Sequence, residues 1–365
     1  MGATPAGRQG VVIVGGGVAG SLLALALRDQ GAAVTLIEPP AEDGRLQGSA
    51  TAISYGALPG WPLASTALAR WAVGASRQWR RLQRRHGDLG WRPQRLALHG
   101  ERPRLSALSR WLPLAQVDTA VLMAQLPLVL AAAGVQIQGA RVQALRPAPG
   151  AEGWELLLTD GACCRAPCVV LAAGAACRSL WPLLPERLRA SWAAVLELPA
   201  FPEALGRSAA CLPQRFARLE LERRAAGLQQ PDWVVDPGLV PRGAGALLGQ
   251  LSLVRPGGLL GDPPDPAQSE QQLRAGLAAD PWGEAVAHQP GVLRQAAVAF
   301  CSGGAPLVGP LPERPGLWTF TGFSAGFSQV PVLAPLLAQR LAAAPAAAAR
   351  AQRRLQQLGV WPVGG

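Results

Sequence analysis

The stretch VVIVGGGVAGSLLALALRDQGAAVTLIE, residues 11–38, decides the fold of this protein. It begins with the apolar run VVIV (11–14) and passes through GGGVAG (15–20) into the helical pattern SLLALALRDQ (21–30). A second apolar run, AVTLIE (33–38), follows. This order predicts a strand, a tight turn, a helix and a second strand, which together form one βαβ unit with parallel strands.

Three glycines in the turn, Gly15, Gly17 and Gly20, match the G-x-G-x-x-G pattern of dinucleotide-binding proteins. The first permits the tight turn, the second lets a pyrophosphate approach the backbone, and the third lets the helix pack closely. The N–H groups at the start of the helix then face the phosphates. Glu38 ends the second strand, where a carboxylate can bind a ribose and would repel the 2′-phosphate of NADP. We therefore predict a dinucleotide site; a glycine turn with a packing role alone is the alternative.

The composition excludes several other classes of protein. With 365 residues, 49% of them hydrophobic and 16% charged, the chain is too apolar for a disordered protein and longer than a typical single domain. It contains no Lys and no Asn, so all 34 basic residues are Arg and the net charge is +11. Without Lys it has no pyridoxal-phosphate Schiff base, Walker lysine or kinase lysine.

The cysteines and apolar runs indicate an intracellular protein. Six cysteines show neither a disulfide framework nor metal-ligand spacing, so we expect them to be reduced and buried, with no metal site: Cys163, Cys164, Cys168, Cys177, Cys211 and Cys301. The glycine pattern explains the apolar run 11–27 better than a signal peptide does. No other stretch is long enough to span a membrane, and we predict a cytoplasmic protein.

A helical pattern from Ser65 to about Arg85 carries much of the positive charge. Counting 100° per residue places Trp71, Ala75, Trp79 and Leu82 on one face and Arg77, Arg80, Arg81, Arg84 and Arg85 on the other. This basic face could bind tRNA or another RNA through its phosphates. The alternative is a solvated face in a protein that uses Arg in place of Lys, since no nucleic-acid-binding motif accompanies the charge.

Further elements are predicted along the rest of the chain. A loose alternation with two prolines at 92–105 is typical of a short edge strand or hairpin. Residues 117–134 predict a helix that begins near Asp118 as its N-cap and ends at Gly134. Strands are expected at 135–138, 140–147, 154–161 and 166–174, and a strand, glycine turn and helix within 303–342. Residues 181–300 show no clear period.

Taken together, the chain resembles the FAD-dependent oxidoreductases of the D-amino acid oxidase family. This family includes glycine oxidases, sarcosine oxidases and the oxidase half of the bifunctional tRNA methylaminomethyluridine enzyme. The similar segments are 11–38, QGSATAIS (47–54), ARVQAL (140–145), CVVLAAGAACRSL (168–180), APLVGP (305–310) and TGFSAGFSQVPVLAPLLA (321–338). The resemblance implies an α/β fold, with a Rossmann-like FAD-binding domain and a second substrate domain built on a mixed β-sheet.

The resemblance also implies where FAD binds. In the family, the small-residue segment lies against the flavin, a valine matching Val142 lies near the adenine, and a glycine turn near the C-terminus closes the flavin site. The predicted cofactor-binding residues are Gly15, Gly17, Val18, Ala19, Gly20, Glu38, Ser49, Ala50, Thr51, Val142, Gly174, Gly322, Ser324, Ala325, Gly326, Phe327 and Ser328. Some sarcosine oxidases attach FAD through a cysteine, but the spacing of Cys301 differs, so we expect non-covalent FAD.

The sequence departs from the family at the substrate site. Members that act on amino acids usually carry an Arg for the substrate carboxylate, but AVAFCSGGAP (297–306) contains none, which leaves Arg294 or Arg255 to substitute. Glycines at 303–304 stand where an acidic residue is often found. Ala325 occupies a position where the tRNA enzyme shows Arg. The flavin site is therefore complete, whereas the amino-acid site is not.

We predict an FAD-dependent oxidoreductase that dehydrogenates the C–N bond of a small-molecule amine or amino acid, with O2 or an electron carrier reoxidising the flavin. Oxidation of a modified nucleoside on tRNA, or a flavoprotein without amine-oxidase activity, are the alternatives. No catalytic residue is assigned; Tyr55, the one tyrosine, could orient a substrate amine, although a core position is the more common role. The predicted domains are residues 1–60, 111–180 and 305–365 for FAD, and 61–110 and 181–304 for the substrate.

Overall fold

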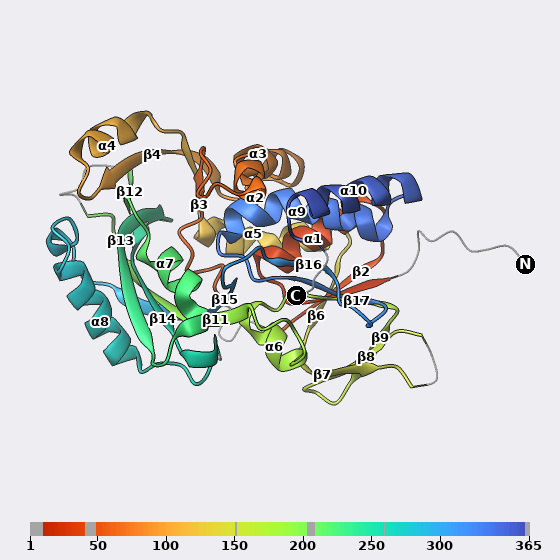
Figure 1. The fold of residues 1–365 in the computed structure, drawn as a ribbon. Coiled ribbons are helices and arrows are strands. Elements are labelled where there is room, and N and C mark those ends of the chain that lie inside the picture. The colour runs from red at the N-terminus through yellow and green to blue at the C-terminus, as the bar shows by residue number, and fades with distance from the viewer. Residues whose placement is uncertain (1–9, 41–48, 150–151, 203–208, 259, 362–365) are drawn as a thin grey trace, which may run out of the picture.

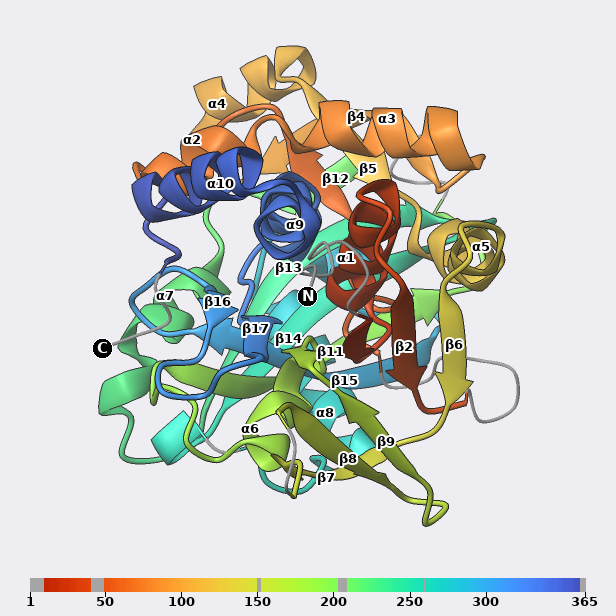
Figure 2. The same ribbon diagram turned by 90° about the vertical axis from the view of Figure 1, so that its right-hand side faces the viewer.

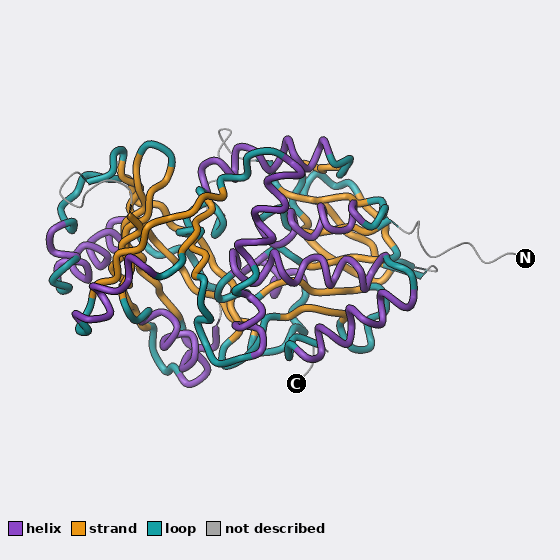
Figure 3. Tube along the Cα trace, turned by 90° about the horizontal axis from the view of Figure 1, so that it is seen from above, coloured by secondary structure: helices purple, strands orange, loops and turns teal. Residues whose placement is uncertain are grey.

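The computed structural model describes residues 10–40, 49–149, 152–202, 209–258 and 260–361. These residues form a six-stranded sheet, an eight-stranded sheet and a small three-stranded sheet. Figure 1 shows the six-stranded sheet with its helices on the right and the eight-stranded sheet on the left. Seen from above, most helices cross over the six-stranded part (Figure 3). The predicted α/β fold with a second, mixed sheet is confirmed.

The six-stranded sheet has β1 near its centre. Its strands, in spatial order, are β16 (Leu307–Pro310), β17 (Leu317–Thr321), β10 (Cys168–Leu171), β1 (Val11–Val14), β2 (Val34–Glu38) and β6 (Gln136–Gly139). β1 pairs in parallel with β2 and β10, so that Val12 lies opposite both Thr35 and Val169. All four residues of β1 are buried, as expected for an apolar strand covered on both faces. The predicted βαβ unit is confirmed.

Helices cover one face of this sheet. They are α1 (Val18–Asp29), α3 (Ala75–His86), α5 (Thr119–Ala132), α9 (Gly326–Ala342) and α10 (Pro345–Gln357). α1 and α9 pack against each other, and Figures 1 and 2 show them side by side above the strands. The core between them includes Ile13, Leu23 and Leu333, all fully buried. The predicted N-cap of α5 is confirmed, because the Asp118 carboxylate accepts a hydrogen bond from the N–H of Ala120 at 2.9 Å.

The other face is covered by the three-stranded sheet and short helices. The elements are β7 (Val142–Pro147), β8 (Trp154–Leu158), β9 (Cys163–Ala166), α6 (Cys177–Leu180) and a 3-10 turn at Gly174–Ala176. Trp154, Leu156 and Leu158 of β8 are buried in the same apolar cluster as Val12 and Val14. Both faces of β1 are therefore packed, which fixes the position of the glycine turn that follows it.

The eight-stranded sheet is mixed. In spatial order it contains β15 (Val292–Cys301), β11 (Leu188–Leu198), β14 (Gly245–Val254), β13 (Asp232–Arg242), β12 (Ala209–Pro213), β4 (Trp91–His99), β5 (Leu114–Val117) and β3 (Ala57–Pro59). Its strands pair antiparallel except β12 and β4, which run parallel. Flanking elements are α4 (Pro103–Leu108), α7 (Ala217–Arg224), α8 (Pro266–Ala278) and 3-10 turns at Ser109–Trp111, Ala225–Gly227, Pro256–Gly258 and Gly283–Ala285.

The helix predicted from Ser65 to Arg85 is wrong as a single element. The chain forms α2 (Ala67–Ala72) and α3, because the Gly74 N–H bonds back to the Trp71 carbonyl and ends the first helix. Trp71, which the count of 100° per residue placed on the same face as Trp79, is 40% exposed. Trp79 is fully buried, and the five predicted arginines of α3 are all exposed.

Two other expectations need correction. The segment predicted as an edge strand or hairpin forms β4, an interior strand followed by a helix; it tolerates Pro93 because β5 pairs with residues 91–94 and β12 only with residues 95–99. The six cysteines are free, but Cys163 is exposed and Cys164 is half-buried, since β9 lies at the edge of its sheet.

Three elements pack outside the domain to which the sequence assigned them. β3 and β5 fall within the predicted FAD-binding ranges but pair in the eight-stranded sheet. α3 falls within the predicted substrate range but packs against α9. The division of the chain into two domains stays a prediction.

Candidate cofactor and active site

The turn after β1 is closed by contacts that require glycine. Gly15 has a φ of +107°, and a Cβ there would lie 2.6 Å from the carbonyl oxygen of Ala172, just after β10. A Cβ on Gly20 would overlap the carbonyl oxygen of Gly15. Because both positions exclude a side chain, the end of β1, the start of α1 and the end of β10 meet directly.

The N-terminus of α1 has open space beside it. A Cβ on Gly17 would meet one atom, the Thr51 hydroxyl oxygen, at 3.2 Å. That hydroxyl accepts a hydrogen bond from the Val18 N–H at 3.0 Å. In the part of the chain that the structure describes, no protein group accepts from the N–H of Ala19 or Gly20. Free N–H groups at the positive end of a helix suit a phosphate.

Thr51 belongs to the small-residue segment predicted from sequence. The Thr51 N–H donates to the Ser49 hydroxyl at 3.2 Å, which folds residues 49–52 into a turn that includes Ala50. The first two residues of the predicted segment, Gln47 and Gly48, lie outside the described residues. The structure therefore brings this segment to the start of α1.

Glu38 lies beside the same turn. Its Oε2 accepts a hydrogen bond from the Gly16 N–H at 2.6 Å. Burial raises the pKa of this carboxyl, while the hydrogen bond from Gly16 and the charge of Arg141 act in the opposite direction. Within the described residues no donor reaches Oε1 of Glu38, so this oxygen could accept from a ribose hydroxyl.

Val142 and Gly174 border the other side of the site. Val142 begins β7 and is buried in one cluster with Val14 and Ile37, at the ends of β1 and β2. Gly174 follows β10 with a φ of +56°, and a Cβ there would meet no atom within 4 Å. The Thr321 hydroxyl donates to the Gly174 carbonyl at 3.5 Å, which joins this turn to the end of β17.

The turn before α9 completes the arrangement. Gly322 has a φ of +80°, and a Cβ there would lie 2.5 Å from Sγ of Cys301. A Cβ on Gly326, the first residue of α9, would lie 3.9 Å from Cγ1 of Val18. The N-termini of α1 and α9 therefore adjoin, and Ser324 and Ala325 lie in the turn that leads to this point.

Trp79 anchors the start of α9 from α3. Its Nε1–H donates to the carbonyl of Phe327 at 2.9 Å, and the two rings stack with centroids 5.8 Å apart. Phe327 and Ser328 are both buried. Sequence reasoning placed Trp79 on the face of its helix opposite the arginines but did not reveal this bond, because 248 residues separate its partners.

These positions fit a dinucleotide. They surround space beside the glycines, they offer the positive ends of two helices, and they include one carboxylate at the end of β2. The helix end at α9 would stabilise negative charge on a reduced flavin ring, while the end at α1 suits the pyrophosphate. The predicted cofactor residues are thus brought together from both ends of the chain, although their contacts with FAD stay predictions.

Tyr55 is buried in the eight-stranded sheet. It is 8% exposed, and its hydroxyl donates to the carbonyl of Gly238 at 3.1 Å. Burial, and then the nearby charge of Asp236, raise its pKa well above the usual value. The hydroxyl is therefore protonated and directed at the backbone, as in a core tyrosine.

A charged cluster, which sequence reasoning missed, lies between α7 and the turn before α9. Nη1 of Arg218 donates to Oε1 of Glu222 at 2.5 Å and to the carbonyl of Ser324 at 3.2 Å. Asp236 of β13 accepts from the N–H groups of Ala217 and Arg218, at 2.5 and 3.3 Å. Burial raises the pKa of Asp236 to about 6. The cluster thus holds two carboxyl groups and one guanidinium next to the candidate flavin turn.

The arginines that could replace the missing substrate arginine are engaged elsewhere. Nε of Arg294 donates to Glu197 at 2.8 Å, and Arg242 pairs with the same carboxylate. Arg255 donates to the carbonyls of Leu260 and Asp262, each at 2.7 Å. Neither side chain is free to pair with a substrate carboxylate in this arrangement.

Cys301 lies beside the turn that leads to α9. Burial raises the pKa of the Cys301 thiol to about 11, so the thiol stays protonated beneath Gly322. Across the described ranges, no three His, Cys, Asp or Glu side chains lie close enough to hold a metal ion. No helix among the described residues is both long and apolar enough to cross a bilayer.

A largely parallel sheet, a glycine turn after its central strand and two adjoining helix ends are typical of a dinucleotide-binding protein. The family model described as DAO, FAD dependent oxidoreductase, matches residues 10–116 and 109–340. The chain therefore belongs to this family and is an FAD-dependent oxidoreductase. A search of the curated proteins found no match.

Solved structures share the fold over almost the whole chain. Glycine oxidase from Geobacillus kaustophilus is 20% identical with a TM-score of 0.66, covering 92% of this chain and 95% of that one. Iminodiacetate oxidase from Chelativorans sp. BNC1 is 20% identical with a TM-score of 0.61, covering 91% and 94%. L-proline dehydrogenase from P. horikoshii is 13% identical with a TM-score of 0.66, covering 91% and 93%.

Proposed function

We propose that FAD binds without a covalent bond along the ends of β1, β10 and β17. Gly17 and the free N–H groups of Ala19 and Gly20 would hold the pyrophosphate, and Glu38 would bind the ribose. The turn from Gly322 to Ser328 would lie beside the flavin ring. FAD bound there would supply the hydride acceptor for oxidation of the substrate. The residues of this chain bind and orient the cofactor and exclude water from it.

We further propose that the substrate is a small amine whose C–N bond is dehydrogenated. The similar solved enzymes are named for glycine, iminodiacetate and L-proline, each of which contains an amine. A reaction that transfers hydride from carbon to flavin needs no separate acid–base pair if the amine binds in its neutral form. This accords with the absence of an assigned catalytic residue, and with a buried, protonated Tyr55.

The observation that carries the choice of substrate is the charge beside the candidate flavin turn. Arg218 is paired with Glu222, and Asp236 lies against the same group. An approaching carboxylate would be repelled by these two acidic groups and would find the Arg218 guanidinium already paired, whereas an amine in equilibrium with its cation would be attracted. We therefore propose an amine without a free carboxylate as the preferred substrate.

Anaerobic bleaching of the flavin tests this proposal. Matched pairs isolate the carboxylate: ethylamine against D- and L-alanine, and dimethylamine against sarcosine. We expect each amine to bleach the flavin at least about tenfold faster than its amino acid, a difference of about 1.4 kcal/mol in the barrier. Faster bleaching by alanine or sarcosine would contradict the proposal.

A control separates an inactive flavoprotein from an enzyme of unknown substrate. Dithionite should bleach the same sample, which shows that the flavin is accessible to reduction. If dithionite bleaches the flavin and a broad panel of amines does not, the protein is a flavoprotein without amine-oxidase activity.

Glu222→Gln removes one acidic charge beside the candidate flavin turn. We expect it to reduce the ratio between the bleaching rate with an amine and the bleaching rate with the matching amino acid.

Oxidation of a modified nucleoside on tRNA is the second candidate. The exposed arginines of α3 favour it, since they could hold a polyanion. In the same assay, tRNA carrying a methylaminomethyl-type nucleoside should then bleach the flavin, and unmodified tRNA should not. We propose the cytoplasm as the location for either reaction.

A further inference from the structure

Four of the helices on one side of the six-stranded sheet, α2, α3, α9 and α10, carry no acidic residue. We call the surface of α2, α3, α9 and α10 the basic helical face. It contains ten arginines: Arg70, Arg77, Arg80, Arg81, Arg84, Arg85, Arg340, Arg350, Arg353 and Arg354. Since the chain has 34 basic and 23 acidic residues, removing these ten leaves 24 arginines against 23 acids. Nearly all of the net charge therefore lies on this face.

Most of this charge is available to a partner. Eight of the ten arginines are exposed, and Arg340 and Arg354 are half-buried against tryptophan rings. Within the described ranges, Arg85 alone among the ten has an ion-pair partner, Asp29 at 2.7 Å. Figures 1 and 2 both show α2, α3 and α10 along the upper side of the molecule.

Large apolar side chains are exposed on α2, just before α2, and at the end of α4. Trp71 of α2 is 40% exposed, and the guanidinium of Arg354 lies 3.9 Å from its ring centroid. Leu63, Leu108 and Trp111 are 42%, 60% and 74% exposed. They lie in neighbouring segments, because the Gly60 N–H donates to the Pro113 carbonyl at 2.8 Å and so joins the chain before α2 to the chain after α4.

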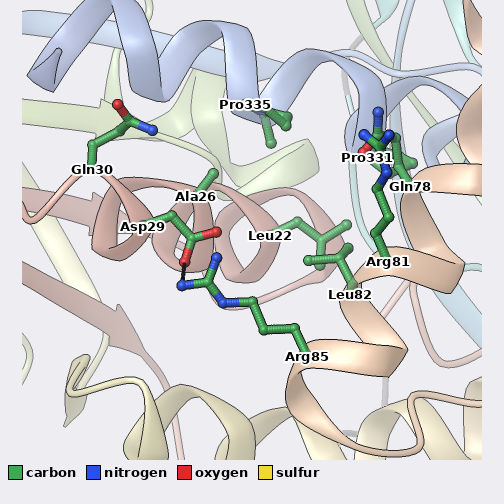
Figure 4. A pocket seen from close by; sticks show the side chains of 11 residues that line it. Leu22, Ala26, Asp29, Gln30, Gln78, Arg81, Leu82, Arg85, Pro331 and Pro335 are labelled. Atoms are coloured by element: carbon green, nitrogen blue, oxygen red, sulfur yellow. Dashed lines mark ion pairs between the residues drawn. The ribbon is translucent and has the colours of Figure 1, made fainter.

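A groove between α1, α3 and α9 also places arginines beside apolar side chains. It is a cavity of about 250 Å³, and Figure 4 shows its floor of Leu22, Leu82 and the α9 prolines, with Arg81 and Arg85 beside it. Arg85 is joined to Asp29 at this point, whereas Arg81 has no acidic partner within the described residues (Figure 4). A phospholipid offers both matching parts, an anionic phosphate and an apolar chain.

We propose that the basic helical face, with the adjoining Leu63, Leu108 and Trp111, docks on the surface of an anionic lipid bilayer. Exposed arginines without acidic partners are attracted to anionic headgroups, and tryptophan favours the boundary between headgroups and acyl chains. RNA would use the arginines and could stack on the tryptophans, but it offers nothing to exposed leucines. The aliphatic side chains therefore favour a bilayer over a nucleic acid.

Vesicle flotation of the FAD-loaded protein tests this docking. Vesicles of phosphatidylcholine with phosphatidylglycerol should carry the protein at low salt, vesicles of phosphatidylcholine alone should not, and added salt should release it. Arg77→Gln with Arg84→Gln should weaken binding at least about tenfold. The matched control is Arg146→Gln with Arg314→Gln, which removes the same charge from β7 and from the loop before β17 and should leave binding unchanged.

A second pair of variants distinguishes a bilayer from RNA. Leu63→Ser with Leu108→Ser removes exposed aliphatic surface without changing charge or any aromatic ring, and we expect it to weaken vesicle binding several-fold. Filter binding with tRNA should be unaffected by the same pair. Failure to float with anionic vesicles at low salt overturns the proposal. Equal vesicle binding by this pair and the unmodified protein, accompanied by tRNA binding, also overturns it and assigns the face to nucleic acid.

Discussion

Gly17 lies where we propose that the pyrophosphate of FAD binds. We expect Gly17→Val to weaken FAD binding at least about tenfold, or about 1.4 kcal/mol, because its methyl groups would enter the space beside the free N–H groups of α1. Fluorescence titration of the apoprotein with FAD measures the change. Gly10→Val is the control, since a Cβ there meets no atom within 4 Å.

The folding of the Gly17→Val protein should be unchanged. Gly17 is the N-cap of α1 in an extended conformation, with φ −64°, so that valine adds no left-handed strain. The circular dichroism spectrum should match that of the unmodified apoprotein. Full flavin content in the purified variant would show that this turn does not hold the pyrophosphate.

Single residues can be assigned a role from the sequence when that role depends on a local motif. Gly15 and Gly20 belong to the G-x-G-x-x-G motif, and the backbone that a Cβ would meet there belongs to the same turn or to the end of the adjacent strand β10. Arg218 is not, because its contact with Ser324 spans 106 residues. The spacing of Arg218 and Glu222 predicts a pair on one helix face, but not that this pair is buried beside the flavin turn.

Asp236, which caps the start of α7, should make the free energy of unfolding depend on pH. Asp236 accepts hydrogen bonds at the start of this helix, is 2% exposed, and has its pKa raised from 3.8 to about 6, mainly by burial. A carboxyl that binds its proton more tightly when folded adds stability as the pH falls. As the pH falls from about 7 to about 4, protonation of Asp236 should therefore raise the free energy of unfolding by up to about 3 kcal/mol.

Asp236→Asn provides the comparison for this prediction. The amide cannot ionise, and its oxygen can still accept from the Ala217 N–H at the start of α7. The free energy of unfolding of both proteins is measured by urea denaturation across this pH range. Their difference should change with pH in the stated direction; parallel pH profiles would show that Asp236 does not titrate there.

Variants of Gly326 test whether the N-terminus of α9 lies beside the flavin ring. A Cβ on Gly326 has ordinary contacts at 3.9 Å with Val18 and Phe323, so Gly326→Ala should leave FAD binding within about twofold. Gly326→Leu would fill the space between the two helix ends. We expect it to lower flavin affinity or shift the flavin reduction potential. An unchanged affinity, spectrum and potential would place this turn away from the ring.

Element boundaries show where local sequence is not sufficient. Ser65 to Arg85 has continuous helical periodicity, yet the chain turns at Gly74 so that Trp79 can reach Phe327 while α2 follows another direction. The two prolines at 92–105 suggest an edge strand, yet β4 is interior because its two neighbours pair with different halves of it. In both cases a distant partner decides the outcome.

At the scale of the whole molecule, Arg218 links an element of the eight-stranded sheet to the flavin turn. Arg218→Met would leave Glu222, which is 4% exposed, buried without its partner. We expect a loss of about 3 kcal/mol in the free energy of unfolding. Combining it with Glu222→Leu should recover most of this loss, because no unpaired charge remains. Denaturation of the single and double variants measures both; equal stability of the two would contradict a buried ion pair.

Which strands join which sheet was the feature least predictable from the sequence. The βαβ unit and the C-terminal strand and helix follow from periodicity and glycine spacing, and the family resemblance predicts their common site. Residues 181–300 gave no period because several of their strands, such as β14, are buried on both faces and therefore lack alternation. β3 and β5 are too short to indicate which sheet they join.

The distance along the chain between the two halves of the cofactor site has a consequence for protein synthesis. While the polypeptide leaves the ribosome, β10 exposes its apolar edge until β17 has been made, and the turn before α9 follows later still. A nascent chain therefore cannot complete the candidate flavin site until synthesis is almost finished. Chains released before β17 would present the open edge of β10 to other proteins, which favours their aggregation over cofactor capture.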